Sequence, residues 1–372
     1  MGSTARQMIM TRFNEPLVLR ELSIPSLQPG QILVELEASG VCGSDIHMWR
    51  GEDPRTPLPM ILGHEGIGHV AEVTTAECWT ADGRRVRVGD RVIWNRGVTC
   101  GRCYACTVLL QPSLCSSRWV YGIHRPADQP PYLNGCYSSH VILQPGTDLF
   151  LAPEGIASDV LVAASCSGAT AAHVFQQAKV EVGDIVVIYG PGPLGAFCTA
   201  FARSKGASEV VIVGSARSRW RMDLCSALGA TQTLVLDETD LESRREVIKG
   251  LSDGRGADLV IEAAGSPMAT VEALEMARIG GHVSIVGYGE PRGEVPIKPF
   301  EHIGRKNLHV QGIWVSDACH LRSALELVYK DPEPFAQLVT HRLPLEEANR
   351  AMRLVELRKT MKAVLVPSSI LE

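Results

Sequence analysis

The pattern of hydrophobic and polar positions changes once along the chain. Up to about residue 155, short apolar runs such as "QILVELEASG" and "DRVIWN" lie between Gly- and Pro-containing turns, without long amphipathic helical patterns. Short apolar segments bounded by turn residues are typical of β-strands. This part of the chain therefore predicts an irregular, loop-rich β domain.

From about residue 180 the pattern alternates between two kinds of segment. Short apolar runs, "IVVIY", "EVVIV", "TLVL", "DLVIEAAG" and "HVSIVG", are separated by helical stretches such as "ATVEALEMARIG". This alternation indicates βαβ units around a parallel sheet, and hence an α/β fold.

The last part of the chain predicts further regular structure. After "NLHVQGIWV", the stretch "HLRSALELVYK" is helical in pattern, and the tail predicts a helix followed by a strand that ends at Pro367. We expect this final strand to complete a sheet of the first domain. We find no fixed-period repeat.

A glycine-rich turn follows the first strand of the α/β region. "VVIYGPGPLGAFCTAF" places Gly190, Gly192 and Gly195 after a strand and at the head of a helix, with Pro193 and Leu194 between them. This spacing allows a sharp turn and a close approach of backbone to a pyrophosphate, which the N–H groups of the helix N-terminus bind. We therefore expect dinucleotide binding here rather than a merely structural turn.

The end of the next strand bears on the choice of coenzyme. An NAD site usually has an Asp or Glu there for the ribose hydroxyls, whereas this chain has Gly214 and Ser215, with Arg217 and Arg219 just beyond. Guanidinium groups without a carboxylate favour a 2′-phosphate. The prediction is NADP(H), with NAD(H) as the alternative, because both arginines could equally be solvated charges of the helix start.

Composition and charge narrow the function classes. The 372 residues are 45% hydrophobic and 21% charged, with a formal net charge of −5. This balance gives no electrostatic reason for binding nucleic acid or anionic membrane. No secretory signal pattern opens the chain, so we expect a cytoplasmic protein with free or metal-bound thiols. Prolines and glycines interrupt the uncharged run 185–202, which predicts a strand, a turn and a helix rather than a membrane span.

Metal-binding residue types occur at two places in the first domain and at its end. "GVCGSDIH" contains Cys42, and "GHEGIGHV" contains His64 and Glu65, in glycine-flanked segments that suit loops. A third candidate, Cys166 in "SCSGATAAH", lies where the first domain gives way to the second. Any one of these residues alone is more often a packed core residue than a ligand.

Four more cysteines lie close together in "CGRCYACTVLLQPSLC". Cys100, Cys103, Cys106 and Cys115 could form disulfides, an iron–sulfur site, a catalytic zinc site or a structural zinc site. A reducing cytoplasm argues against disulfides, although iron–sulfur ligands can be similarly spaced. Four thiolates around zinc would leave no position for substrate, which suits a structural role.

Taken together, these motifs resemble the zinc-dependent medium-chain alcohol dehydrogenases. "CGSDIH", "GHEGIGHV", the four-cysteine segment and "GPGPLG" occur in the order of that family, and the resemblance covers nearly the whole chain. It implies a GroES-like β-rich catalytic domain at 1–160 and 315–372, with a zinc lobe at about 95–118. A Rossmann coenzyme domain is expected at 161–314.

The resemblance also implies two zinc ions per chain. Cys42, His64 and Cys166 would ligate the catalytic zinc and leave a fourth position open for water or substrate oxygen. Glu65 would lie near this metal as a transient ligand, and Asp45 would accept the other ring N–H of His64. The four-cysteine lobe would hold the second zinc, although eight residues separate its last two cysteines where relatives commonly have seven.

The implied reaction is hydride transfer between an alcohol and a nicotinamide, or reduction of an aldehyde or ketone in reverse. Zinc would favour the alkoxide, and Ser44 would pass the hydroxyl proton through the coenzyme ribose to His47 and solvent. Thr170 would pack against the nicotinamide. The residues that could line the substrate pocket are Trp49, Asn95, Arg96 and Trp314. Arg96 could recognise an anionic or oxygen-rich substrate, or simply bond to the backbone of the lobe.

Two other functions compete with this one. A non-catalytic zinc-binding regulatory protein would keep the four-cysteine lobe and lose parts of the catalytic set, and a zinc-free quinone or enoyl reductase would lack the ligands. The whole set is present, which favours the dehydrogenase. The resemblance further implies a homodimer or homotetramer that binds a small alcohol, aldehyde or ketone, whose identity the sequence does not specify.

Overall fold

The computed structural model describes residues 4–75 and 77–367, which form two compact units. The first unit comprises 1–166 and 316–372, and the second comprises 167–315. The sequence had placed these boundaries at 160 and 315. Cys166 therefore belongs to the same unit as Cys42 and His64.

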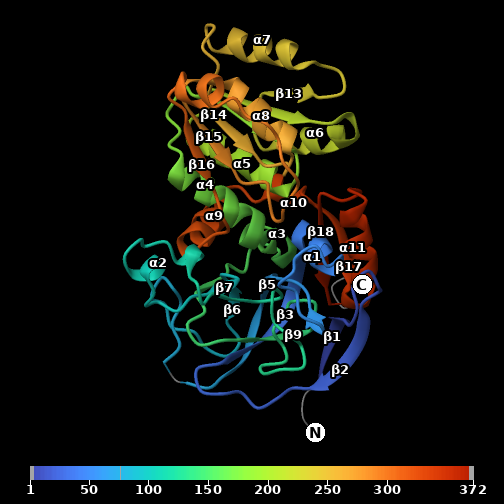
Figure 1. Cartoon of the computed structure of the whole chain (residues 1–372). Helices are drawn as coiled ribbons and strands as arrows, with labels where there is room; N and C mark the ends of the chain where they lie inside the picture. Colours follow the sequence, from blue (N-terminus) through green and yellow to red (C-terminus); the bar gives the residue numbers. More distant parts are fainter. Residues whose placement is uncertain (1–3, 76, 368–372) are drawn as a thin grey trace. The chain divides into compact units, whose positions relative to one another are not determined.

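The first unit is built around a β-sheet whose strand order is β10-β6-β5-β3-β18-β17, with β9 also paired to β3 (Figure 1). A separate small sheet has the order β2-β1-β4, and β7 pairs with β8 in the lobe. The strands of this unit are β1 Thr4–Met10, β2 Val18–Ser23, β3 Ile32–Val41, β4 Met60–Ile61, β5 Glu65–Val73, β6 Arg91–Trp94, β7 Gly97–Val98, β8 Trp119–Val120, β9 His140–Leu143, β10 Leu149–Leu151, β17 Val339–Pro344 and β18 Lys362–Val366.

The helices of the first unit are mostly short. They are α1 Gly43–Trp49, α2 Tyr104–Thr107, α3 Ser158–Val162, α9 Ala318–Lys330, α10 Glu333–Ala336 and α11 Ala348–Glu356, with the 3₁₀ turn η1 Pro112–Leu114. Helix α11 packs against β18 and α1. The apolar cores of this unit lie on the β-sheets and under α1 and α11.

The last strand returns to the first unit, as the sequence suggested. Strand β18 runs antiparallel to β3, with Val364 opposite Gly40, and β3 in turn places Gly40 opposite Glu65 of β5. All five residues of β18 are buried. The C-terminal strand thus lies across β3 from the beginning of β5, which directly follows His64.

The second unit is a six-stranded parallel sheet with the order β13-β12-β11-β14-β15-β16. Helices α5, α6 and α8 contact its strands, as Figure 1 shows. The elements are α4 Ala169–Gln177, β11 Ile185–Tyr189, α5 Pro193–Ser204, β12 Glu209–Gly214, α6 Arg219–Ala227, β13 Gln232–Val235, α7 Leu241–Leu251, β14 Ala257–Glu262, α8 Pro267–Met276, β15 Ala277–Ile285 and β16 His309–Gly312.

Successive strands are added on one side of β11 up to β13 and then on its other side from β14 onward. The neighbours of β11 are therefore β12 and β14, and both are parallel to it. In doubly wound sheets, ligands bind at such a switch point, beyond the carboxyl ends of the strands. The glycine-rich turn directly follows β11, so the topology places the predicted phosphate-binding segment at that point. Among the described helices, none is both long and apolar enough to cross a membrane.

Candidate metal and coenzyme sites

The first potential ligand, Cys42, lies at the start of helix α1, directly after β3. Its backbone N–H donates to Asp45 Oδ2 at 2.9 Å, so the carboxylate caps the helix start from inside the first turn. Asp45 is fully buried and also accepts a hydrogen bond from Tyr137 Oη at 2.9 Å. The position of Cys42 is therefore fixed by bonds that its own helix and Tyr137 supply.

The second segment joins β4 to β5 and carries His64 and Glu65. Gly63 has φ +91°, and a Cβ at this position would lie 2.5 Å from Tyr137 Cδ1. Glycine is needed here because an L side chain would be strained in this conformation and would also collide with the tyrosine ring. The sequence had suggested loops around both residues, whereas Glu65 already belongs to strand β5.

The third segment is a single wide turn of helix, η2 Ala164–Gly168, which contains Cys166. π-helical turns are rare and are often found at functional sites. One ligand atom from each of Cys42, His64, Glu65 and Cys166 lies within 4.8 Å of the others. The structure therefore brings together residues from three distant parts of the sequence.

This donor set fits a divalent metal. The His64 side chain is fully buried, and its Nδ1 lies 3.3 Å from Asp45 Oδ1. Within the described part of the chain, His64 Nε2 is buried and has no hydrogen-bond partner. A buried ring nitrogen beside two thiols is the environment expected for a zinc ligand, with the carboxylate orienting the ring.

The electrostatics of His64 suit this interpretation. Burial alone would lower the pKa of His64, but the Asp45 carboxylate and the Cys42 sulfur raise it to about 9. Without a metal, the His64 ring therefore holds a proton at neutral pH. The neighbouring Cys166 thiol and the His64 ring hold the pKa of the Cys42 thiol well below its ordinary value, despite burial.

A buried ion pair that the sequence analysis missed completes this cluster. Lys362 Nζ contacts Glu65 Oε2, and both side chains are almost fully buried. Gly40 makes room for the carboxylate, since a Cβ there would lie 2.0 Å from Glu65 Oε2. The one signal in the sequence was a lysine at the start of an otherwise apolar strand, "KAVLV".

Asn95 and Arg96, predicted to line a substrate pocket, follow β6 and have different surroundings. The Asn95 amide donates to the Gly97 carbonyl at 3.3 Å, and its backbone N–H to Asp148, so it supports the lobe backbone. The Arg96 guanidinium instead contacts Cys166 Sγ through Nη1. From the sequence, Arg96 was expected either to bind an anionic or oxygen-rich substrate or to bond to the lobe backbone. A contact with the Cys166 sulfur is neither of these roles.

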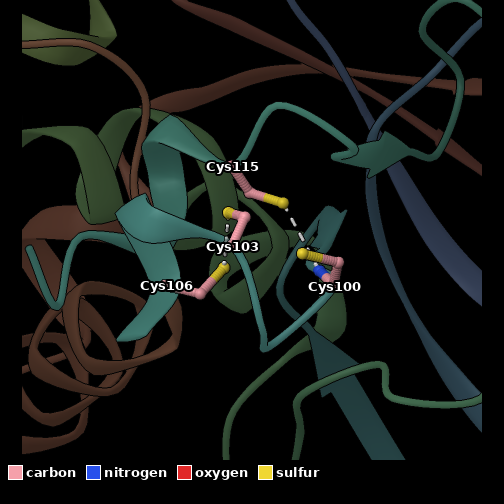
Figure 2. Close-up of side chains that lie close together, drawn as sticks. All are labelled: Cys100, Cys103, Cys106 and Cys115. Atoms are coloured by element: carbon pink, nitrogen blue, oxygen red, sulfur yellow. Dashed lines mark hydrogen bonds between the residues drawn. The ribbon is translucent and has the colours of Figure 1, made fainter. Parts of the chain in front are cut away.

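The four cysteines of the lobe form a second cluster, shown in Figure 2. Their sulfur atoms lie within 4.8 Å of one another, and the Cys103 and Cys106 sulfurs are 3.5 Å apart. The Cys100 backbone N–H points to Cys115 Sγ at 3.4 Å. The eight residues between Cys106 and Cys115 include the last residue of α2, Thr107, and the whole of the turn η1. Four thiols with no disulfide among them are the donor set of a structural zinc.

The glycine-rich turn of the second unit lies between strand β11 and helix α5. Gly190 has φ +103°, and Gly192 precedes helix α5, whose first residue is Pro193. A Cβ on Gly195 would lie 1.9 Å from the Gly190 carbonyl oxygen, so only glycine lets the helix start this close to the strand. The backbone cradle fits a pyrophosphate at the N-terminus of α5.

The segment after β12 shows how the predicted coenzyme-selecting residues lie. Arg219 forms an ion pair with Glu238, and Asp237 Oδ2 accepts the Ala216 N–H at 2.5 Å. Within the described residues, Arg217 has no carboxylate partner. Of the two arginines, Arg217 is therefore the one whose charge is available to a ligand.

The remaining predicted residues are placed as follows. Ser44 and His47 are half-buried on helix α1, three residues apart, and His47 Nδ1 lies 2.6 Å from Glu52 Oε2. The Trp49 indole N–H donates to the Glu15 carbonyl at 2.6 Å, and its ring packs against a core cluster. In the second unit, Thr170 is half-buried near the start of α4, and Leu194 and Ser215 are also half-buried. Trp314, near the end of that unit, is 44% exposed.

Comparison with known proteins agrees with this geometry. Residues 28–154 match the alcohol dehydrogenase GroES-like domain, and residues 193–330 match the zinc-binding dehydrogenase domain. The chain is 32% identical over 348 residues to 5-exo-hydroxycamphor dehydrogenase of Pseudomonas putida, a match that covers 93% of this chain and 94% of that one. The chain belongs to the zinc-containing alcohol dehydrogenase family.

Two solved structures are similar to this dehydrogenase over nearly its whole length. An alcohol dehydrogenase from Thermotoga maritima is 45% identical, with a TM-score of 0.95, over 98% of this chain and 100% of that one. A zinc-binding dehydrogenase from Sinorhizobium meliloti 1021, bound to NADP, is 27% identical, with a TM-score of 0.83, over 98% and 100% of the two chains. The dehydrogenase thus has a GroES-like domain and a Rossmann domain, and acts on alcohols with zinc and NAD(P).

Proposed function

We propose that Cys42, His64 and Cys166 hold the catalytic zinc of this dehydrogenase and that Glu65 is its exchangeable neighbour. The observation that carries this proposal is the convergence of the four donor groups within 4.8 Å, around a His64 Nε2 that has no other partner among the described residues. Zinc bound there supplies a Lewis acid for an alcohol or carbonyl oxygen. The four-cysteine lobe holds a second zinc, which stabilises the fold.

Residues of helix α1 would then transfer the hydroxyl proton of the substrate to solvent. Ser44 and His47 lie one helical turn apart on α1 and so share a face of the helix. Ser44 accepts the substrate hydroxyl proton, and His47 delivers it to solvent. The Glu52 carboxylate, 2.6 Å from His47 Nδ1, fixes which ring nitrogen carries the proton. Asp45 orients His64 through its 3.3 Å contact.

For the coenzyme, we propose a preference for NADP(H) over NAD(H). The coenzyme would lie on the turn formed by Gly190, Gly192, Pro193, Leu194 and Gly195, with Thr170 at the nicotinamide. Gly214 and Ser215 leave no carboxylate at the end of β12, and Arg217 has a free charge for a 2′-phosphate. Asp237 opposes this preference, because its carboxylate accepts the Ala216 N–H and so places a negative charge beside Arg217. Arg219 contributes less, since Glu238 neutralises it.

We further propose a cytoplasmic homodimer or homotetramer whose substrate is a small alcohol, aldehyde or ketone. The eleven cysteines are all free thiols, as a reducing compartment requires. Trp314 and Arg96 remain the candidates for walls of the substrate pocket, while the bonds of Trp49 and Asn95 favour structural roles for those two residues.

The test of the proposed function is paired steady-state kinetics with NADP and NAD over primary, secondary, cyclic and polyol alcohols. We expect turnover with zinc present and a higher kcat/KM for NADP. Replacing Arg217 by Gln should lower kcat/KM for NADP by about tenfold and leave NAD nearly unaffected, because a charged hydrogen bond to phosphate is lost. Arg219→Gln is the matched control, with a smaller effect. Equal kcat/KM for both coenzymes in the unmodified enzyme would contradict the NADP preference.

A further inference from the structure

The guanidinium of Arg96 differs from the other buried cations of the dehydrogenase. Arg96 is only 6% exposed and, among the described residues, has no carboxylate within ion-pair distance. By contrast, Lys362 is paired with Glu65, Arg91 with Glu37 at 2.8 Å, and Arg244 with Glu272 at 2.7 Å. A buried guanidinium without a carboxylate partner is costly, which calls for an explanation.

The partner that Arg96 does have is a ligand of the proposed metal. Arg96 Nη1 contacts Cys166 Sγ, and this is its one side-chain hydrogen bond within 4–75 and 77–367. A guanidinium carries five N–H donors in a planar fork, so most of them have no protein acceptor. Guanidinium donors without a protein acceptor beside a metal ligand can bind an anionic group of a substrate.

Most of the other charged groups of the cluster have a partner of opposite charge within it. A divalent metal neutralises the Cys42 and Cys166 thiolates, and Lys362 neutralises Glu65. Asp45 Oδ2 accepts hydrogen bonds from the Cys42 N–H and Tyr137 Oη, and Asp45 Oδ1 lies 3.3 Å from His64 Nδ1. With the metal bound, Asp45 and Arg96 carry the two remaining charges of this cluster, which are opposite in sign, and Arg96 has no ion-pair contact with any carboxylate among the described residues.

A second arginine adds to the positive potential around Arg96. Arg118 is half-buried, packs on Gly97, and donates from Nη2 to the Ser316 carbonyl at 3.0 Å. Burial and the nearby Arg96 charge lower the pKa of Arg118 to about 10, although Asp317 partly compensates. Its Nε is buried without an acceptor among the described residues. The surroundings of Arg96 thus favour an anion and not a further cation.

We propose that Arg96 binds a carboxylate of the substrate, so that the preferred substrate is a hydroxy acid whose carboxylate lies one or two carbons from the carbinol carbon. Since Arg96 contacts a metal ligand, such a substrate can place its hydroxyl oxygen at the metal and its carboxylate on the guanidinium fork. This inference rests on the proposed function.

The reaction is then the oxidation of a hydroxy acid to an oxo acid. The carbinol carbon loses its hydrogen as hydride to the nicotinamide ring of NAD(P)⁺, the hydroxyl proton leaves through Ser44, and a carbonyl forms. The carboxylate itself is unchanged. In reverse, an oxo acid is reduced by NAD(P)H and takes up one proton.

The test compares 3-hydroxybutyrate with its methyl ester, and lactate with methyl lactate, as substrates of the zinc-loaded enzyme. The informative quantity is the ratio of kcat/KM for each acid to that for its ester. We expect the unmodified enzyme to favour the acids, and Arg96→Gln to lower the ratio by about 10- to 100-fold, the effect of one charged hydrogen bond. Arg96→Lys should recover part of the ratio, and Arg102→Gln, an exposed arginine of the lobe, should leave it unchanged.

A binding measurement complements the kinetics. Calorimetric titration of the zinc-loaded enzyme with butyrate should give a Kd about 10- to 100-fold higher in Arg96→Gln than in the unmodified enzyme. Two zinc ions per chain in the variant would show that the fold and both metal sites are intact.

The outcomes separate the two proposals. If Arg96→Gln lowers kcat/KM for acid and ester equally, with butyrate affinity unchanged, Arg96 acts only on the metal ligand and the inference is wrong. If the unmodified enzyme oxidises esters and neutral alcohols but has no preference for acids, the inference is also wrong while the proposed function stands. If it oxidises none of these substrates with either coenzyme, the proposed function fails.

Discussion

The dehydrogenase has two cysteine-containing clusters, and they differ in how the chain builds them. The lobe takes all four sulfurs from residues 100–115, and three of its cysteines are half-exposed. The catalytic cluster takes its donors from Cys42, His64, Glu65 and Cys166, and the last strand adds Lys362. A local cluster can fasten one loop, whereas a cluster built from distant segments exists only once the sheet has formed.

The donor sets of the two clusters also differ in whether they leave a coordination position open for substrate. Four thiolates complete a tetrahedron, while two thiolates and one imidazole leave a position for substrate. Glu65 lies close enough to fill that position, but it is held by Lys362. The comparison therefore assigns stability to the lobe and chemistry to the buried cluster.

The largest expected effect is the loss of catalysis when the buried cluster loses its imidazole. His64→Ala should lower kcat/KM by on the order of 1000-fold or more, because the Lewis acid is lost. Zinc content, measured by plasma mass spectrometry, should fall from about two to about one per chain. A variant that retained full activity after metal stripping would break the assignment.

The next effect concerns the lobe and should fall on stability. Cys103→Ser should also remove about one zinc, and it should lower Tm by about 10 °C or more, since a structural metal contributes directly to folding. Its kcat/KM should decrease far less than that of His64→Ala. Thermal unfolding and kinetics on the same preparation check both points, and unchanged zinc content would contradict a metal in the lobe.

A third prediction concerns the buried pair that distinguishes the catalytic cluster. Lys362→Met should lower the free energy of unfolding by about 3–5 kcal/mol, because it leaves the buried Glu65 carboxylate without its partner. Adding Glu65→Gln to this variant should restore part of the loss. Denaturant unfolding measures both, and Lys359→Met, an exposed control nearby, should cost less than about 0.5 kcal/mol.

The smallest effect is a pH dependence of metal binding at the buried cluster. The pKa of His64 is raised to about 9, so below that pH the metal must displace a proton from this residue. Zinc affinity should therefore fall by about tenfold per pH unit between pH 8.5 and 7 on account of His64. Chelator competition on Cys103→Ser isolates this site, and an affinity independent of pH over that range would show that His64 is not a ligand.

The local part of this architecture could be predicted from the sequence. The turn from Gly190 to Gly195 and the lobe cysteines are defined by neighbours within a few residues, and the structure shows both as expected. The alternation of apolar runs and helical stretches likewise predicted the parallel sheet. Family resemblance, and not spacing, linked Cys42, His64 and Cys166.

The remainder depends on contacts between distant segments, which no local pattern encodes. The Lys362–Glu65 pair exists because β18 lies beside β3 in one particular register. Tyr137 donates to Asp45 across 92 residues of sequence, and Arg96 meets Cys166 across 70. Trp49 was placed in the pocket by its position after the segment "SDIHM", but its indole N–H donates to the Glu15 carbonyl.

The most direct test of the account is anomalous diffraction from crystals of the zinc-loaded dehydrogenase, recorded on either side of the zinc absorption edge. The account predicts two zinc peaks per chain, one among Cys42, His64 and Cys166 and the other among the four lobe cysteines. A single peak in the lobe, with none at His64, would contradict it.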